Sequence, residues 1–342
     1  MSIGLRPYLI SLALLLAALI LSIAAGPVFI PPGTIVRILA NSLPGVTLAA
    51  DWPQNYLAIV YQIRLPHAFL ILLTGAALGG SGAAYQGVFR NPLADPYLIG
   101  VASGAGLGAV AAMAVRWPLG LLSLYAIPMA AFLGALITVV LVYSLARVGG
   151  ALPTTTLILA GVAVSAFATS LTSFLMLRSS HELRRAIGWL LGGSILSGWE
   201  PVLVILPYIV IGLGLLLSSG HALNVLQFGE EQAVQLGLPA ERAKVLILLA
   251  ASLTTAAAVA FSGVIGFIGL IVPHLARLIW GHDYRSLIPL SILGGGAALL
   301  LADLIARTAL APQIIPVGIV TALVGAPFFL WVLRRAKNQV YW

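Results

Sequence analysis

Ten apolar runs, each close to the length of a membrane crossing, constrain this chain more than any other feature. A helix needs roughly 20 mostly apolar residues to cross the hydrocarbon core of a bilayer. Only 8% of the 342 residues are charged, against about 25% in a soluble domain. The sequence therefore predicts an all-α, polytopic membrane protein, with residues 1–342 forming a single transmembrane domain of ten helices. The ten runs are Tyr8–Ala25, Ala68–Phe89, Tyr97–Val115, Leu119–Leu145, Leu157–Leu177, Pro201–Leu217, Val245–Phe261, Gly263–Ile279, Leu287–Ala302 and Pro316–Leu333.

The basic residues indicate how the chain is oriented. An even number of spans puts both termini on one side, and loops rich in Lys and Arg favour the cytoplasm. With the termini inside, ten of the 17 basic residues fall in inner segments and seven in outer ones. We therefore expect a cytoplasmic (inner) membrane protein with both termini in the cytoplasm. The first run exceeds the length of a signal-peptide core, so we expect it to stay as an uncleaved helix.

A polar heptad, Arg90–Pro96 (R-N-P-L-A-D-P), separates the second and third runs. Each of its two prolines lacks an amide donor, and unsatisfied backbone costs several kcal/mol inside hydrocarbon. The heptad must therefore cap a crossing or line a wettable path between helices. Prolines near other span ends, such as Pro273 and Pro316, predict kinked or broken helices, which suits a transporter. Glycines four residues apart, as at Gly75 and Gly79, predict close helix packing.

The segment Gly220–Lys244 is a polar stretch between two spans, on the predicted inner side. Its short amphipathic turns are separated by Gly229 and Gly237, which predicts short helices lying across the inner membrane face. A helix resting on lipid headgroups is expected to carry a lysine-rich polar face. Here the polar face carries Glu230 and Glu231, which anionic headgroups would repel. We therefore interpret the segment as a contact for a protein partner, with an interfacial helix as the alternative.

Several functional classes find little support in the residues. The basic residues are scattered singly between apolar runs, so nucleic acid is not an expected partner. With no cysteine in the chain, disulfides and thiolate metal sites are excluded. An intramembrane enzyme needs paired acids, metal ligands or a nucleophile with its base at depth, and no such set is visible. An ion-coupled secondary transporter needs ionisable groups near mid-membrane. The carboxylates fall at span ends or between spans, so this class is kept only as an alternative.

Five segments carry longer motifs that follow one another along the chain: Arg64–Pro96 (R-L-P-H, then G-A-A-L-G-G-S-G-A-A-Y-Q-G-V-F-R-N-P-L-A-D-P), Leu157–Ala163 (L-I-L-A-G-V-A), Gly229–Gly237 (G-E-E-Q-A-V-Q-L-G), Ser262–Arg277 (S-G-V-I-G-F-I-G-L-I-V-P-H-L-A-R) and Ala302–Leu330 (A-D-L-I-A-R, then I-P-V-G-I-V-T-A-L-V-G-A-P-F-F-L). Together they resemble the FecCD-type family of bacterial ABC-importer permeases for iron–siderophore complexes, haem and vitamin B12. The family's ten helices per subunit agree with the ten runs.

The resemblance implies the architecture of a type II ABC importer. In such an assembly two permease subunits, here a homodimer, enclose a central pathway. Two ATPase subunits lie below it in the cytoplasm, and an extracytoplasmic solute-binding protein delivers the cargo. ATP and Mg²⁺ would bind the ATPase subunits, so the chain itself is not expected to be an enzyme or to hold a cofactor or metal.

The resemblance also assigns a coupling role to the acidic segment. Glu231 and Ala233, followed by Gly237, match the motif that rests in a groove of the ATPase, and Gly229 and Glu230 open the same motif. A rigid helix-turn-helix at this position can transmit closure of the ATPase into tilting of the spans on either side.

The cytoplasmic gate is assigned in the same way. By similarity, Asn91 and Leu93 lie where the family narrows its pathway, together with Thr154 and Thr155. A gate for bulky chelates needs modest side chains that close a ring without binding the cargo tightly. The threonines have a structural interpretation as well, because a hydroxyl N-cap could open the helix expected near Leu157.

Docking of the binding protein is expected to use cations on the outer side. Arg64 and Arg307 match the family's docking positions, while His67 stands where an arginine is usual and carries less charge at neutral pH. Arg307 follows Asp303 by four residues, so a structural ion pair is the alternative role. Ile314 stands where many relatives carry an acidic residue, which leaves that position without an inference.

His274 and Arg277 belong to the motif P-H-L-A-R near the inner end of the eighth run. The motif occurs across the family regardless of cargo, so a role near the carbonyl end of a helix is preferred to haem or metal ligation. We therefore predict a permease that imports a bulky metal chelate, a ferric siderophore or haem, by alternating access driven by ATP on a partner. Import of cobalamin (vitamin B12) by the same machinery is the alternative.

Overall fold

The computed structural model describes residues 4–26, 28–42, 44–45, 51–115, 117, 121–149, 152–178, 182–193 and 196–337. Two short turns of helix, η1 (Ile59–Arg64) and η2 (Pro96–Ile99), precede α4 and α5. The α-helices are α1 (Arg6–Ala24), α2 (Pro32–Ala40), α3 (Gln54–Ala58), α4 (Leu65–Val88), α5 (Val101–Met113), α6 (Leu121–Ala146), α7 (Thr154–Arg178), α8 (Leu183–Leu190), α9 (Trp199–Ser218), α10 (Gly220–Leu226), α11 (Glu230–Gln235), α12 (Ala240–Ser262), α13 (Ile268–Trp280), α14 (Tyr284–Thr308) and α15 (Val317–Lys337).

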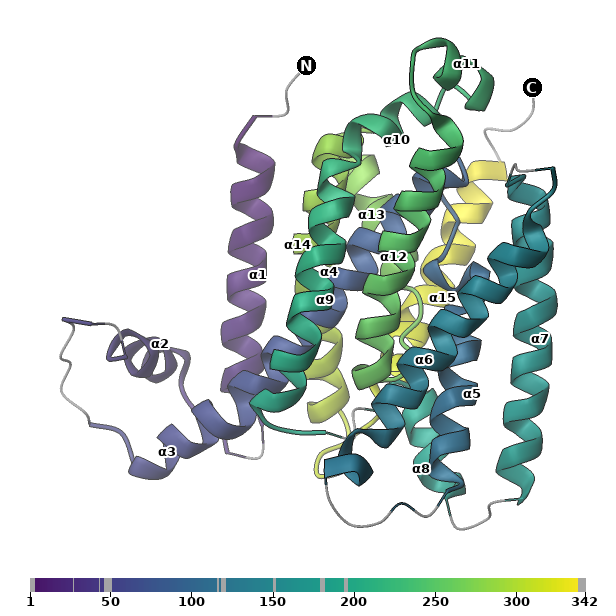
Figure 1. Ribbon diagram of the computed structural model, residues 1–342. Coiled ribbons are helices and arrows are strands. Elements are labelled where there is room, and N and C mark those ends of the chain that lie inside the picture. The colour runs from purple at the N-terminus through teal and green to yellow at the C-terminus, as the bar shows by residue number, and fades with distance from the viewer. Residues whose placement is uncertain are drawn as a thin grey trace.

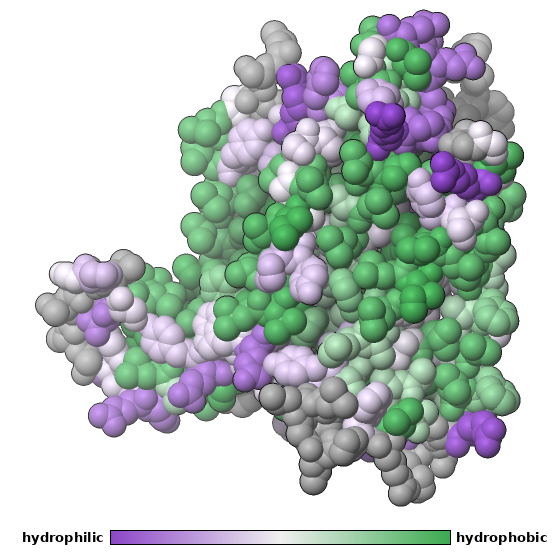
Figure 2. Space-filling model, viewed as in Figure 1, coloured by the Kyte–Doolittle hydropathy of each residue, from purple (hydrophilic) through white to green (hydrophobic). Residues whose placement is uncertain are grey.

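The predicted all-α membrane fold is confirmed. Within the described residues, seven helical segments are long and apolar enough to cross a bilayer, and they contain α1, α4, α6, α7, α9, α12 and α14. The shorter apolar helices α5, α13 and α15 account for the other three predicted runs. Figure 2 shows the expected surface, with apolar side chains across the middle of the viewed face and polar ones gathered towards its ends.

The two short helices α10 and α11 mark one end of the bundle, which we call the α11 end. The described chain starts at this end in α1 and finishes there in α15 (Figure 1). The sequence predicts the termini and the segment Gly220–Lys244 on one side of the membrane, and the first and last described residues lie at the same end of the bundle as this segment. The opposite end, which we call the α8 end, carries α8, and α2 and α3 extend sideways near it (Figure 1).

α4 is the central helix, and its partner α14 approaches it backbone to backbone. Almost every residue of α4 is buried, and its most extensive packing is against α14. A Cβ added to Gly75 would overlap the carbonyl oxygen of Gly295, and a Cβ on Gly295 would overlap that of Gly75. Gly79 meets the carbonyl of Ser291 in the same way. The close packing predicted from the glycine spacing is therefore confirmed for this helix pair.

Two of the predicted runs begin with backbone that is not α-helical. α13 begins at Ile268, because the preceding residues are unwound between Gly263, with φ of 77°, and Phe267, with φ of 70°. The Tyr97 hydroxyl holds this unwound segment, since it donates to the Ile265 carbonyl at 2.9 Å and accepts from the Ile265 amide at 3.2 Å. Tyr97 itself lies in η2, ahead of α5. Non-helical backbone at membrane depth is tolerated where protein satisfies its polar groups in this way.

Candidate functional site

The segment predicted to couple the chain to a partner forms two short helices at the α11 end. α10 and α11 follow α9 and precede α12, so long helices hold the segment from both sides (Figure 1). Gly229 precedes α11 with φ of 107°, and Gly237 follows it with φ of 85°. Side chains disfavour these backbone angles, and glycine does not. The two glycines therefore fix the turns on either side of α11.

α11 and its flanks present both acidic and apolar side chains to the surroundings. Glu231 is exposed, and so are three large apolar side chains near it, Phe228, Val234 and Leu236. An apolar patch of this kind at a polar end of the bundle is typical of an interaction site. Ala233 is fully buried against the rest of the chain. Its small side chain lets α11 lie close to the bundle, and its role in coupling stays a prediction.

Lys244 is a buried ionic junction beneath α11. Its side chain is 3% exposed, and its ammonium lies 2.8 Å from a carboxylate oxygen of Glu230 and 2.9 Å from one of Glu241. The ammonium also donates to the carbonyl oxygen of Leu152 at 3.1 Å. The Leu152 amide in turn lies 3.3 Å from the other carboxylate oxygen of Glu241. Since Leu152 stands two residues before Thr154, the first residue of α11 is joined to the start of α7 through one lysine.

A second contact joins the coupling segment to the polar heptad. Gln227 lies in the turn between α10 and α11, and its amide nitrogen donates to the carbonyl oxygen of Gly87 at 3.3 Å. Gly87 lies in the last turn of α4, directly ahead of the heptad. Within the heptad, the Asn91 side-chain oxygen accepts a hydrogen bond from the Leu93 amide at 2.9 Å. The coupling segment therefore touches both parts of the chain that carry predicted gate residues.

The predicted gate residues lie on neighbouring elements. Asn91 and Thr155 are exposed, whereas Leu93 and Thr154 are half-buried. The element after the heptad, η2, packs on α7. Their place at the end of a pathway and their gating role stay predictions.

Thr156, the third threonine of the run, has a structural role that differs from the N-cap considered from sequence. Its hydroxyl donates to the Pro153 carbonyl at 2.8 Å and to the Ala146 carbonyl at 3.0 Å. An N-cap side chain would instead accept a hydrogen bond from a helix amide. Thr156 therefore connects the end of α6 to the start of α7, and these two hydrogen bonds do not involve the hydroxyls of Thr154 and Thr155.

Arg64, a predicted docking residue, is buried and engaged inside the protein. Only 8% of the residue is exposed, and its guanidinium donates to the carbonyl oxygens of Ile23 at 2.7 Å and Ala24 at 3.0 Å, and also to that of Val28. The last carbonyls of a helix lack partners within it, and cations there are favourable. Arg64 therefore caps the C-terminal end of α1. To touch a binding protein it would first have to leave these carbonyls.

His67 and Arg307 meet at Asp303 at the same end of α1. Asp303 is buried and lies 2.8 Å from Arg307 and 3.0 Å from the His67 ring nitrogen. Arg307 also donates to the Ser22 hydroxyl at 2.9 Å and to the Ala25 carbonyl at 3.2 Å. The structural ion pair considered as an alternative for Arg307 is thus present. Docking stays a prediction for all three positions, and the observed contacts are internal.

His274 lies in α13 with its ring edge-on to Phe328, at a centroid distance of 6.3 Å. Arg277 lies in the last turn of α13, and its guanidinium donates to the Tyr284 hydroxyl at 3.2 Å. In the part of the chain that the structure describes, His, Asp and Glu side chains form no group of three that could hold a metal ion. The helix-end position is confirmed for Arg277, whereas His274 lies in the middle of α13 (Ile268–Trp280) and not at its carbonyl end.

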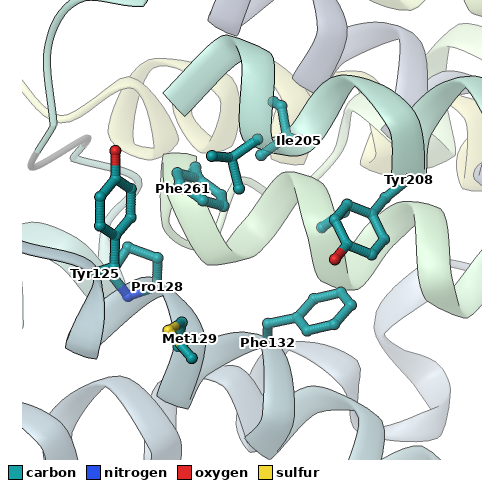
Figure 3. Close-up of a pocket in the computed structure, with 9 residues that line it drawn as sticks. Tyr125, Pro128, Met129, Phe132, Ile205, Tyr208 and Phe261 are labelled. Carbon is teal, nitrogen blue, oxygen red and sulfur yellow. The ribbon is translucent and has the colours of Figure 1, made fainter. Parts of the chain in front are cut away.

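An apolar crevice of about 230 Å³ lies apart from these residues, between α6, α9 and α12. Figure 3 shows its aromatic walls, which include Phe132 and Tyr208 on facing helices. Tyr125 at its rim donates to Glu200 at 2.8 Å. None of the predicted coupling, gate or docking residues lines this crevice.

Comparison with known proteins gives consistent matches along the chain. The family model described as the FecCD transport family matches residues 14–335. The chain is 46% identical over 321 residues to the cobalamin import system permease protein BtuC of Halobacterium salinarum, covering 89% of this chain and 85% of that one. It is 42% identical over 286 residues to the hemin transport system permease protein HmuU of Yersinia pestis, covering 81% and 84%.

A solved structure has the same fold. It is described as an inward-facing conformation of a transporter assigned to the metal-chelate type of ABC transporters. The two chains superpose with a TM-score of 0.79 at 30% sequence identity, covering 96% of this chain and 98% of that one.

Proposed function

The chain belongs to the FecCD transport family, and we propose from this that it is the permease subunit of an ATP-driven importer for a bulky metal chelate. The cargo would cross the membrane by alternating access, and ATP would be hydrolysed on a separate subunit. With this role the α11 end faces the cytoplasm. The α8 end then faces the solute-binding protein.

The observation that carries the proposal is the double connection of α11. Lys244 joins Glu230 to the segment that leads into Thr154. Gln227, in the turn before α11, contacts the end of α4 ahead of Asn91. A partner that pushes on the exposed face of α11 would therefore displace both predicted gate segments together. The Lys244 side chain is buried, at 3% exposed, so this connection runs through a group held inside the bundle.

The proposed assembly contains two copies of this chain, two ATPase subunits and one solute-binding protein. The exposed Glu231, with the apolar patch of Phe228, Val234 and Leu236, supports an ATPase contact at α11. Glu230 contributes to this contact indirectly, because it is engaged by Lys244. Mg²⁺ and ATP would be held by the ATPase subunits.

For the cargo we propose a ferric siderophore or haem, with cobalamin as the alternative. The relatives are named for cobalamin and for hemin, so a planar or cage-like metal chelate in an organic shell fits the family. The predicted gate residues are small or uncharged, which suits a cargo that must pass without being trapped. The names of these relatives do not decide between the three chelates.

An ion-coupled carrier is the competing function. Its mechanism requires ionisable groups that face the pathway near mid-membrane. The buried carboxylate of Asp303 is the strongest candidate in a span, and it lies near the end of α14, where Arg307 and the His67 ring already engage it. We therefore prefer the ATP-driven mechanism.

Reconstitution in liposomes tests the proposal. The chain would be assembled with its ATPase and its binding protein, and uptake of ferric siderophore, haem and cobalamin would each be measured. We expect uptake of one of them to require ATP hydrolysis and to survive collapse of the ion gradients. Uptake that continues without ATP and stops when the gradients collapse would overturn the proposal in favour of a carrier.

A further inference from the structure

A crevice of about 540 Å³ opens at the α11 end between the end of α6 and the first turns of α12. Its walls contain two arginines, Arg147 and Arg242, together with Glu241, Tyr143 and three apolar residues. This crevice is separate from the exposed face of α11. It belongs to neither of the two gate segments, although Leu152 at the junction with Lys244 forms part of its wall.

The charge in this crevice is positive and uncompensated. Glu241 is already engaged, because its carboxylate holds the Lys244 ammonium at 2.9 Å and the Leu152 amide at 3.3 Å. Arg147 and Arg242 are both exposed, and neither forms an ion pair with any residue in the described part of the chain. Two guanidinium groups that share a concave site can bind one phosphate group through charge-assisted hydrogen bonds.

The flank next to the two arginines is apolar. Leu246 and Leu249 follow Arg242 at four and seven residues along α12, which places all three on one face of the helix. Leu246 is 67% exposed and Leu249 is 47% exposed. On α6, Leu145 stands just before Arg147 and is 61% exposed. The crevice therefore marks the boundary at which the apolar flank of the bundle meets its polar end.

We propose that this crevice binds the headgroup of an anionic phospholipid. The lipid phosphate would lie between Arg147 and Arg242, and its acyl chains would run along Leu246 and Leu249. Basic pockets between membrane helices on the cytoplasmic side are suited to such headgroups. A soluble protein partner fits less well, because the exposed leucines adjoining the arginines belong to helices that cross the membrane.

The inference depends on the proposed function only for the leaflet, which would be the cytoplasmic one. A lipid held here would contact the wall that contains Leu152 and Glu241. Both residues belong to the junction through which Lys244 links α11 to α7. Occupancy of the crevice would therefore stiffen that junction from the membrane side.

Lipid binding can be measured on the purified chain in detergent by native mass spectrometry. The probes are dioleoyl phosphatidylglycerol and dioleoyl phosphatidylcholine, added separately at equal concentrations. We expect phosphatidylglycerol to bind about tenfold more tightly, as two arginines near an anionic headgroup imply. In the double variant R147Q/R242Q, binding of phosphatidylglycerol should fall to that of phosphatidylcholine. The charge-preserving variant R147K/R242K should retain most of the preference.

A matched control removes two exposed arginines elsewhere. R178Q/R184Q makes the same change in net charge at the α8 end, and it should leave the lipid preference intact. Equal loss in both double variants would show a general charge effect and overturn the site. An unchanged preference in R147Q/R242Q, or one that excess inorganic phosphate abolishes completely, would overturn it too. Weakened ATPase assembly with unchanged lipid binding would assign the arginines to the protein partner instead. Because no transport is measured, these outcomes leave the proposed function untouched.

Discussion

Asn224 and Asp283 hold α10 against the start of α14 by hydrogen bonds that run in both directions. The Asn224 amide nitrogen donates to the Asp283 carboxylate at 2.6 Å, and the Asn224 side-chain oxygen accepts from the Tyr284 amide at 2.9 Å. Asp283 also accepts from the Arg285 amide at 3.0 Å and so caps α14. One side-chain pair therefore fixes both the position of α10 and the first turn of a spanning helix.

The Asp283 carboxylate should make stability depend on pH. Hydrogen bonds from Arg285, and then from Asn224, hold its pKa well below the usual value near 3.8. A lowered pKa in the folded state contributes stability that is complete above the unfolded pKa and is lost as pH falls below it. We expect the melting temperature of the wild-type protein to begin to fall as the pH drops below about 4, the unfolded pKa, and to keep falling towards the lower folded pKa. In Asp283→Asn this part of the pH dependence should disappear. An identical profile in the variant would contradict the assignment.

Glu230→Gln should uncouple ATP hydrolysis from transport. The substitution removes the charge that joins α11 to Lys244 and leaves the pair of Lys244 with Glu241 in place. In the reconstituted transporter we expect ATP hydrolysis to continue while the amount of cargo moved per ATP falls several-fold. Glu182→Gln is a matched control, because Glu182 has the same 39% side-chain exposure as Glu230 and pairs with Arg185 at the α8 end. A normal transport ratio in Glu230→Gln would argue against the junction.

Lys244→Met should destabilise the fold itself. It would leave the carboxylates of Glu230 and Glu241 close together without their shared cation, and because each is 39% exposed the expected cost is about 1 kcal/mol, nearer to that of a surface pair. We expect a lower melting temperature and poorer recovery of folded protein from membranes. Lys244→Arg keeps the charge and should restore most of the loss. Wild-type stability in Lys244→Met would show that the ammonium is not needed.

Arg64→Gln and Arg307→Gln should lower stability as well as any docking. Both guanidinium groups bond the carbonyls at the end of α1, and lost hydrogen bonds of charged groups cost about 1.5–3 kcal/mol. Thermal unfolding measures this cost, and affinity for the solute-binding protein measures docking on the material that remains folded. Arg185→Gln, at an exposed position on α8, serves as a control for loss of charge at the same end. Weakened docking with unchanged melting would instead support the docking role predicted from the sequence.

Gly75→Ala should disrupt the bundle although it adds only a methyl group. The new Cβ would meet the Gly295 carbonyl, and forced overlap in a packed core typically costs about 1–3 kcal/mol. Gly214→Ala on α9 is the control, because a Cβ there has nothing within 4 Å. We expect it to be neutral or slightly stabilising, since alanine favours helix more than glycine does. Equal melting temperatures for the two variants would contradict the close approach.

The sequence was sufficient for the features that depend on local composition. Apolar run length predicted the spans, and Gly229 and Gly237 predicted the turns around α11, because both signals lie within a few residues. Long-range pairs carry no such signal. His67 meets Asp303 across 236 positions, and Lys244 meets Leu152 across 92. Only the folded chain brings them together.

Other differences arose where tertiary contacts replaced helical hydrogen bonds. The residues between Gly263 and Phe267 are as apolar as a helix, so hydropathy could not separate them from α13. Their backbone is unwound because Tyr97 supplies partners from another element. Similarly, arginine is usually exposed, so the residue type alone predicts that Arg64 and Arg307 lie at the surface. The free carbonyls at the end of α1, which sequence does not reveal, draw both side chains inward.

The contact of Gly75 with Gly295 also limits how the protein can move. Sliding α4 past α14 by one position would drive a side chain of one helix into a carbonyl of the other. We therefore expect α4 and α14 to move together as one rigid body. Any change of shape during a transport cycle would then come from other helices that move relative to this pair.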